Sequence, residues 1–363
     1  NGDLYSNGSL EINEALPDVY AAELNAIAGF INVNFASEKF SGSLGLRYEV
    51  DNIYVDWNVA NYVGRTGNIS NEYRNLFPAV NLKYQVTGKS LFRLAASKTT
   101  TIPEFKELSP FEYVSPTGDI TKGNPDLKNS INYNVDLKWE LFPSAKELIS
   151  IAGFYKNIQD PINLALTRGS SGFFKYENTG KEADVYGVEL EGRINLLRIV
   201  ETGRPNIYLV LNATRMWFKQ DLLEYFQYND KTQTGLEGAA EFIANSSIRY
   251  SSNTEKELVA TLTGNYSSDK IFALGAPESL ASSDVLFNDE IIENGFFTLD
   301  FVLSKKISDR ISLKFSAKNL LDPTIKLTQQ VKTLSTENTS NAIVRSYKKG
   351  RQFSMGINIS LNK

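Results

Sequence analysis

Two kinds of side chain are missing from this chain of 363 residues, which contains no cysteine and no histidine. Without cysteine, a disulfide framework and any thiolate-based zinc or redox site are excluded. Without histidine, Ser-His triads, histidine-ligated zinc and histidine general bases are excluded as well. An enzyme could still use paired carboxylates, so these absences exclude some classes of catalysis but not all.

Two further absences concern charge and hydropathy. The formal net charge is −4, so the chain lacks the basic footprint of nucleic-acid-binding proteins and we expect no such partner. It also lacks any apolar run of about eighteen residues, which excludes a transmembrane helix, and no signal-like stretch follows Asn1. A content of 42% hydrophobic and 22% charged residues still indicates a folded chain.

Strict alternation of apolar and polar residues is what the sequence has instead. From Phe353 to Leu361 every second residue is apolar, and the residues between are polar or small. Such segments are about twice the length of an ordinary globular strand, and a helix would scatter their charges around its axis. The pattern predicts about thirteen strands, at residues 26–36, 40–58, 73–87, 89–98, 126–142, 147–167, 173–196, 206–219, 239–251, 256–268, 295–306, 310–320 and 350–361.

The connections between these strands alternate in length. Short turns fall at residues 37–39, 87–89, 143–146, 201–205, 252–255 and 308–310, and longer polar segments near 59–72, 99–125, 168–172, 220–238, 269–294 and 321–349. A soluble β-sandwich also alternates inside and outside, but its strands are shorter and its loops have no reason to alternate. A transmembrane barrel requires both features. The sequence therefore predicts an all-β fold, a transmembrane antiparallel β-barrel in the outer membrane.

The direction of the strands predicts that this barrel is incomplete. The first and the last predicted strand run the same way, toward the short-turn side, so they cannot pair with each other antiparallel. Bacterial single-chain barrels have an even number of strands, and an open edge in lipid leaves backbone groups unpaired at several kcal/mol each. We expect residues 1–363 to be the C-terminal part of a single barrel domain, whose plug and early strands lie upstream.

Several segments resemble one family. SLKFSAKNLLDP followed by SYKKGRQFSMGINISL is similar to the last two strands of TonB-dependent receptors of the outer membrane. FPAVNLKYQVTGKSLFRLAASKTTTIPEFKELSPF, GNPDLKNSINYNVDLKWELFP and YENTGKEADVYGVELEGR resemble earlier segments of the same family, and FYKNIQDPI resembles receptors of Bacteroidetes-type bacteria. The residues that match the terminal motif are Asn319, Leu320, Asp322, Gly350 and Arg351.

The resemblance implies a 22-stranded barrel around an N-terminal plug. Such receptors are not enzymes and import a scarce nutrient, such as a siderophore, an oligosaccharide or a peptide. The partners it implies are outer-membrane lipid and the chain's own plug and missing strands. It also implies the inner-membrane TonB complex, which the missing N-terminal region would contact. Related importers have a surface lipoprotein as a further partner. It implies no cofactor. A barrel that anchors a surface partner without import, and a soluble β-rich binding module or glycosidase, remain as alternatives.

Three tryptophans and one charged row have expected positions on the barrel wall. Trp57, Trp139 and Trp217 lie toward strand ends, where an aromatic girdle at the membrane interface is expected. Glu189, Glu191 and Arg193 alternate with apolar residues and should face the lumen in one row. Contact with the plug or with neighbouring charged rows is the simpler reading of this row, and a substrate path or a glycosidase carboxylate pair are the others.

The long outer loops are where a ligand would meet the protein. The candidate ligand-binding residues all lie in the segment 101–128, and they are Glu104, Phe105, Phe111, Tyr113 and Asn124. Loop packing and turn formation around the prolines of this segment are the alternative role. The acidic segment 287–294 could hold calcium, but its spacing fits no dedicated calcium loop and a solvated face is the alternative. No metal site is predicted.

Overall fold

A computed structural model describes residues 5–6, 9–10, 19–58, 66–116, 118–167, 173–197, 205–228, 230–252, 254–276, 288–332 and 339–360. Within these ranges the chain is almost entirely antiparallel β structure. The exceptions are α1 (Phe105–Leu108) and the 3-10 turn η1 (Glu224–Phe226), and β1 (Tyr5–Ser6) and β2 (Ser9–Leu10) form a separate small hairpin. No helix of the described residues is both long and apolar enough to cross a membrane.

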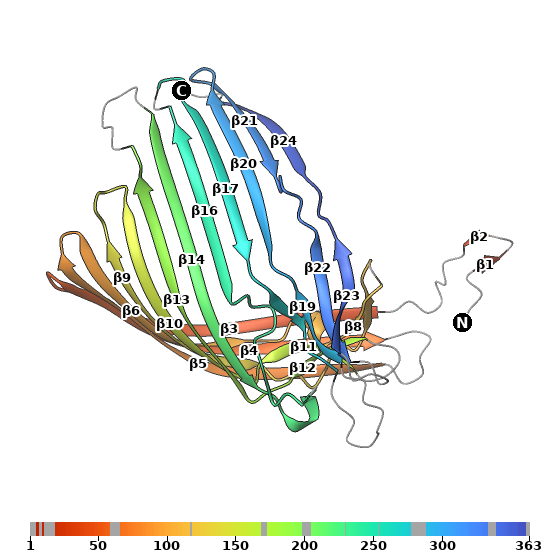
Figure 1. Ribbon diagram of the computed structural model, residues 1–363. Coiled ribbons are helices and arrows are strands. Elements are labelled where there is room, and N and C mark those ends of the chain that lie inside the picture. The colour runs from red at the N-terminus through yellow and green to blue at the C-terminus, as the bar shows by residue number, and fades with distance from the viewer. Residues whose placement is uncertain are drawn as a thin grey trace.

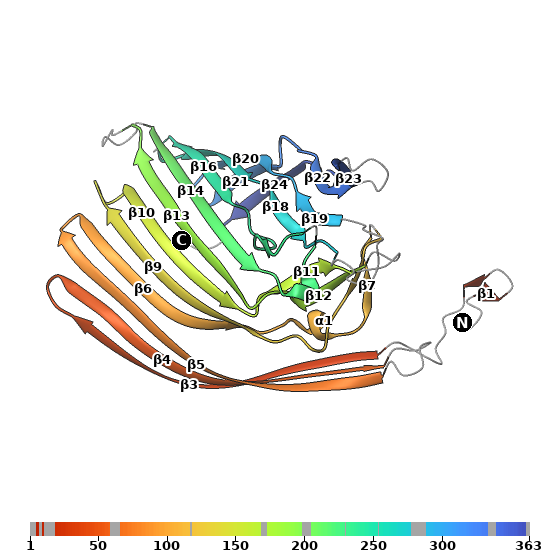
Figure 2. The same cartoon turned by 60° about the horizontal axis from the view of Figure 1, so that its bottom comes forward.

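One fourteen-stranded sheet forms the body of the molecule. Its strands, in chain order, are β3 (Val19–Ala36), β4 (Phe40–Asn58), β5 (Thr66–Thr87), β6 (Ser90–Thr101), β9 (Ser130–Leu141), β10 (Leu148–Gln159), β13 (Glu182–Asn195), β14 (Asn206–Asp221), β15 (Gln233–Thr234), β16 (Phe242–Ser251), β17 (Leu258–Ser267), β20 (Phe296–Lys306), β21 (Ile311–Lys318) and β24 (Gln352–Ile359). Each strand pairs antiparallel with its neighbour in sequence, and β15 is a short strand beside β14. The sheet curls into an open trough (Figures 1 and 2).

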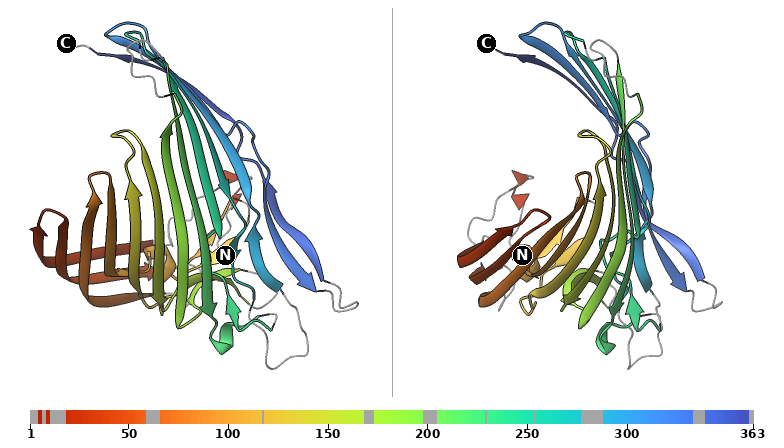
Figure 3. Two further views of the ribbon diagram at one scale, coloured as in Figure 1. Left: turned by 60° about the vertical axis from the view of Figure 1, so that its left-hand side comes forward. Right: turned by 90° about the vertical axis from the view of Figure 1, so that its left-hand side faces the viewer.

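The trough does not close on itself. Among the described residues, β3 pairs only with β4, and β24 pairs only with β21. Because every neighbouring pair on the path is antiparallel, β3 and β24 run in the same direction. Short turns lie along one rim and the long connections along the other, as the views in Figure 3 show. The sheet is therefore a barrel wall with two free edges.

The predicted strands match those of the sheet one for one, β15 aside, but several boundaries were wrong. The predicted strand 147–167 is broken at Asp160, whose φ is +49°, and at Pro161, which has no N–H to donate to a ladder. The strand 173–196 is likewise divided, and β5 begins at Thr66, inside a segment predicted as loop. Segments 269–294 and 321–349 were also predicted as loops, yet they contain four strands, which are described below.

The two faces of the sheet differ in chemistry. On β13, Tyr186, Val188 and Leu190 point to one face, where Leu190 is 50% exposed, while Glu189 and Glu191 point to the other. Opposed residues on neighbouring strands share a face, so the register carries this division from strand to strand. In a barrel the apolar face meets lipid and the charged face lines the lumen. We call them the outward face and the luminal face.

Residues of the terminal motif bind one another where β21 ends and β24 begins. The Asn319 side chain donates to the Gly350 carbonyl at 2.8 Å, and the Gly350 N–H donates to Asp322 at 2.9 Å. The Arg351 guanidinium donates to the Leu320 carbonyl at 2.9 Å. Asn319, Asp322 and Gly350 all have positive φ, which only glycine and short polar residues adopt readily. The motif thus ties the ends of the last long connection together.

A charge placed on the outward face should be far more costly than the same charge on the luminal face. Leu190→Arg puts a guanidinium toward hydrocarbon, at a cost of about 2–4 kcal/mol near the bilayer midplane. Glu189→Arg, one residue away on the luminal face, is the matched control. We expect the first variant to lower the fraction of urea-resistant protein in outer membranes and the control to leave it close to wild type. Equal losses for both variants would contradict the assignment of the faces.

Candidate functional site

The long connections of the sheet form a packed layer rather than separate loops. Two four-stranded sheets make up this loop layer, in the orders β11-β12-β8-β7 and β18-β19-β22-β23. Their strands are β7 (Glu112–Val114), β8 (Ile120–Lys122), β11 (Ile162–Leu166), β12 (Phe174–Asn178), β18 (Lys270–Ala273), β19 (Asn288–Glu293), β22 (Ile325–Lys332) and β23 (Thr339–Tyr347). A parallel bridge between Ala165 and Leu274 joins the two sheets.

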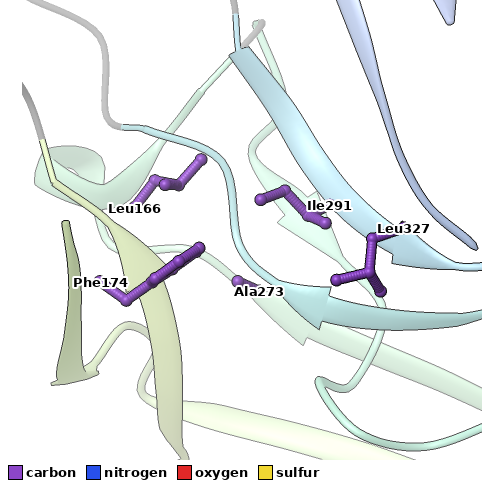
Figure 4. Packing of buried hydrophobic residues seen from close by; sticks show 5 residues of the cluster. All are labelled: Leu166, Phe174, Ala273, Ile291 and Leu327. Atoms are coloured by element: carbon purple, nitrogen blue, oxygen red, sulfur yellow. The ribbon is translucent and has the colours of Figure 1, made fainter. Parts of the chain in front are cut away.

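A hydrophobic cluster fills the space between these two sheets. Leu166 and Phe174 come from the first sheet, and Ala273, Ile291 and Leu327 from the second, and all five are at least nine-tenths buried. Figure 4 shows their side chains converging from both sides. Burial of side chains of this size contributes roughly 1.5–3 kcal/mol each. The loop layer therefore has a core of its own.

A second cluster attaches the loop layer to the luminal face of the barrel wall. Ile53 and Val55 of β4 are buried against Leu108 of α1 and Leu127. Trp57 packs against the same cluster, so it lies under the loop layer and not on the outward face. The girdle proposal then rests on the other two tryptophans.

Three of the predicted ligand-binding residues have structural partners. Glu104 is the N-cap of α1 and forms a capping box with Glu107, and Phe105 packs against the second cluster. Asn124 is only 5% exposed and donates to Glu177 at 2.7 Å. Phe105 and Asn124 therefore hold the layer together, and a ligand at the surface would reach Glu104 but not Asn124.

The two remaining predicted residues form an aromatic group with a partner that sequence reasoning missed. The rings of Phe111 and Tyr113 have centroids 6.5 Å apart, and Tyr20 of β3 meets Phe111 edge to face at 5.7 Å. Tyr113 is 39% exposed. Tyr20 lies some ninety residues upstream and carries no local signal that would connect it with this loop. The group presents an aromatic surface suited to stacking on a ligand ring.

The predicted luminal carboxylates bond to neighbours on adjacent strands. Glu191 accepts a hydrogen bond from the Lys138 ammonium at 3.1 Å, and Glu189 accepts one from Asn212 at 2.8 Å. Lys138 also lies 3.9 Å from Glu140, a member of the same face of β9. Arg193 lies two positions beyond Glu191 in the same row and is exposed. Glu189 and Glu191 of this row are therefore bonded to side chains of the neighbouring strands, and contact of the row with a plug stays a prediction.

Trp139 and Trp217 lie at opposite ends of the outward face. Trp139 opposes Phe92 near the short turns and donates from its indole to Ser90 at 2.9 Å. Trp217 lies near the long connections and stacks on Tyr186, with centroids 5.7 Å apart and planes at 17°. This placement supports two aromatic belts, one for each interface of the membrane.

Within the acidic segment 287–294, of which the structure describes residues 288–294, Asn288–Glu293 form β19. The Lys231 ammonium donates to Asp289 at 2.6 Å and to Glu290 at 2.7 Å. Burial acts to raise the pKa of Asp289, but hydrogen bonds from Glu290 and Lys231 outweigh it and lower that pKa. For Glu290, burial and the hydrogen bond with Asp289 raise the pKa. Among the described residues, no three carboxylates lie together as a metal site would require.

One half-buried carboxyl of the loop layer forms no ion pair with a described residue. Glu237 accepts a hydrogen bond from the Leu164 N–H at 3.3 Å, and the charged groups that act on it are Glu107 and, more weakly, Lys270. Burial raises the pKa of Glu237 from 4.5 to about 7. The carboxyl is therefore neutral in mildly acidic medium and charged in alkaline medium.

This titration should make the stability of the loop layer depend on pH. The folded-state pKa of Glu237 is about 7 and the unfolded value 4.5, so between these values the folded state holds a proton that the unfolded state has lost. Stability therefore falls as pH rises through this window, by at most about 3 kcal/mol. Glu237→Gln should remove the fall, with thermal unfolding midpoints equal to wild type near pH 4.5 and higher above pH 7. A wild-type midpoint that rises over this window would contradict the assignment.

An ion pair also ties the last long connection to the β7–β8 hairpin. Arg345 of β23 donates to Asp119, and its guanidinium lies 6.0 Å from the ring centroid of Phe272. We expect Arg345→Gln to speed amide hydrogen exchange in residues 112–122 by about tenfold, because a charged hydrogen bond contributes on the order of 1.5–3 kcal/mol. Arg310→Gln, at the opposite rim, is the control. Unchanged exchange in the first variant would show that the ion pair is not needed and that pairing of β8 with β12 holds the hairpin.

Comparison with known proteins identifies the fold. The family model for the TonB dependent receptor-like β-barrel matches residues 2–320. The copper transporter OprC is similar in structure, with 16% identity and a TM-score of 0.60 over 93% of this chain and 48% of that protein. The ferric yersiniabactin uptake receptor FyuA from Yersinia pestis has 14% identity and a TM-score of 0.59 over 94% of this chain and 46% of that one. The FrpB iron transporter from Neisseria meningitidis has 14% identity and a TM-score of 0.55, over 93% and 45%.

The chain thus spans about half the length of these solved receptors. A search of curated proteins found no match. At such low identities the structural likeness shows the fold alone, and that fold is the open antiparallel wall described above. The family match extends over most of the sequence. The chain therefore belongs to the TonB-dependent receptor family, as part of an outer-membrane β-barrel.

Proposed function

We propose that this chain supplies the C-terminal strands and outer loops of a TonB-dependent importer of a scarce nutrient, such as a siderophore, an oligosaccharide or a peptide. The observation that carries the proposal is a barrel wall of the receptor family whose long-loop rim is filled by a packed layer with an exposed aromatic group. Two of the similar structures are described as an uptake receptor for ferric yersiniabactin and a copper transporter. The motif FYKNIQDPI supports a receptor of the Bacteroidetes type.

The free edges support a larger barrel. β3 and β24 are exposed along nearly their whole length, with Ile27 74% and Ile357 64% exposed. In hydrocarbon an unpaired backbone group costs several kcal/mol. We infer that further strands of the same domain pair with both edges, and that a plug with the TonB-contacting segment lies with them. A surface lipoprotein is a further partner in this proposal.

The luminal carboxylates support a role in binding rather than catalysis. Glu191 is paired with Lys138, and Glu189 is bonded to Asn212 across the β13–β14 ladder. A retaining or inverting glycosidase needs two carboxyl groups that both face the substrate. Both groups here are engaged by their neighbours on the wall. We infer that the chain is not an enzyme.

A growth experiment tests import. A deletion strain should fail to grow when the correct nutrient is supplied at limiting concentration, and the full-length gene should restore growth only if the TonB system is active. Restoration in a TonB-inactive strain, or no nutrient that depends on the gene, would favour a surface anchor instead.

The aromatic group provides a matched pair of variants for this experiment. We expect Phe111→Ala with Tyr113→Ala to raise the nutrient concentration needed for half-maximal growth by about tenfold, because stacked rings contribute roughly 0.5–1.5 kcal/mol each beyond their burial. Tyr225→Ala removes an exposed ring of η1 and is the control. If the control shifts growth as much as the double variant, the aromatic group is not the contact.

A further inference from the structure

A large cavity opens where two strands of the barrel wall separate. β14 pairs with β16 up to Arg215, which opposes Phe242, and beyond that point its edge pairs with β15 at Gln220 and Asp221. Between these two partners lies a cavity of about 780 Å³. Its walls are the end of β14, the segment 231–241, the connection from β17 to β18, and β19. The luminal row described above contributes nothing to it.

Part of the cavity wall belongs to the outward face of the sheet. Arg215 and Lys219 share one face of β14 with Trp217, which stacks on the outward-facing Tyr186, whereas Phe218 lines the cavity from the other face. On the opposite wall, Tyr266 packs beside Phe242, with ring centroids 6.1 Å apart. The two cations and Tyr266 are therefore on the side of the wall that meets lipid.

The same aromatic residues set the depth of the cavity in the membrane. Trp217 and Tyr266 belong to the belt at the long-connection end, where amphipathic rings sit at the level of lipid headgroups. Below the cavity, Leu211 and Leu262 are exposed on the outward face and would meet acyl chains. An amphiphile with its head in the cavity could therefore lay its tails along the wall beneath it.

Two of the cations that line the cavity are available to a ligand. Arg215 lies 2.7 Å from Glu241, and Lys219 lies 3.7 Å from Asp221, and the side chains of both pairs are more than two-fifths exposed. Exposed ion pairs of this kind contribute little to stability, so an incoming anion can replace the carboxylates. Lys231, which also lines the cavity, is by contrast held by Asp289 and Glu290, whose side chains are both less than one-fifth exposed.

The neutral lining and the size of the cavity indicate more than an anion. Gln233, Thr234 and Ser268 add hydrogen-bonding groups beside the cations. The volume lies in the range of sites for small organic ligands and far exceeds what one phosphate needs. A head with sugar hydroxyls and phosphate groups matches both the polar lining and the cations.

We propose that this cavity binds the phosphorylated saccharide head of a glycolipid of the outer leaflet, with Arg215 and Lys219 contacting its phosphate groups. The proposal requires only that the barrel lies in the outer membrane, and it does not depend on import. A bound lipid at this place would also brace the gap in the wall where β14 and β16 lose their mutual hydrogen bonds.

Native mass spectrometry of the full-length protein in mild detergent tests the proposal, with lipid A as the phosphorylated glycolipid probe. Arg215→Gln with Lys219→Gln should weaken lipid A binding by about tenfold or more, because charge-assisted hydrogen bonds to phosphate are lost. Arg74→Gln with Lys98→Gln is the matched control, since both cations lie on the outward face of β5 and β6, away from the cavity. The control should bind within about twofold of wild type.

Three results would overturn the proposal. Binding by the cavity variant equal to wild type would remove Arg215 and Lys219 from the site. Equal binding of a dephosphorylated glycolipid would remove the phosphate groups from recognition. Displacement of lipid A by inorganic phosphate at comparable concentration would show a free-anion site instead of a headgroup site. Because the readout is lipid binding, each of these results leaves the growth experiment on import unaffected.

Discussion

The whole structure depends on one constraint, that each backbone N–H and C=O group in hydrocarbon must be bonded by a neighbouring strand. Long antiparallel strands satisfy this constraint, because each strand bonds the backbone groups of its neighbours along its whole length. The constraint is also consistent with a sheet that follows sequence order without crossovers, in which each wall strand pairs with the next wall strand along the chain through a short turn or a long connection. Among the described residues, β3 and β24 are the two strands of the wall that leave one whole edge unpaired.

A second consequence follows from the two solvents on either side of the wall. The outward face of β13 carries Tyr186, Val188 and Leu190, while Glu189 and Glu191 on the luminal face are bonded to Asn212 and Lys138. Charges that would be costly in lipid thus bond one another across the luminal ladder. At the long-connection rim neither solvent is hydrocarbon, and there the chain builds the loop layer with its own core.

The difference between the barrel wall, which separates lipid from lumen, and the loop layer, which does not, also decides how much of the fold could be predicted from sequence. Between lipid and lumen, the period of two is imposed by the surroundings, so the strands from β3 to β24 could be found by alternation alone. In the loop layer β7, β8, β18, β19, β22 and β23 were missed, because they lie inside the long connections, which were predicted as loops. An aromatic residue near a strand end is expected in a membrane-interface belt, and Trp217 lies where such a belt would be. The same expectation was wrong for Trp57, because the sequence could not show that Trp57 packs against the cluster that contains Leu108 of α1. Phe111 and Tyr113 could be named from the sequence as loop residues, whereas Tyr20 could not be connected with them, since only tertiary packing brings it to Phe111.

The most direct test of the account is the intact mass of the native protein extracted from outer membranes in mild detergent. The account requires further strands of the same polypeptide on both free edges, so it predicts a mass well above the 40.6 kDa of this chain. A mass of 40.6 kDa would contradict it, because the edges of β3 and β24 would then have to be paired by other chains or left open in lipid.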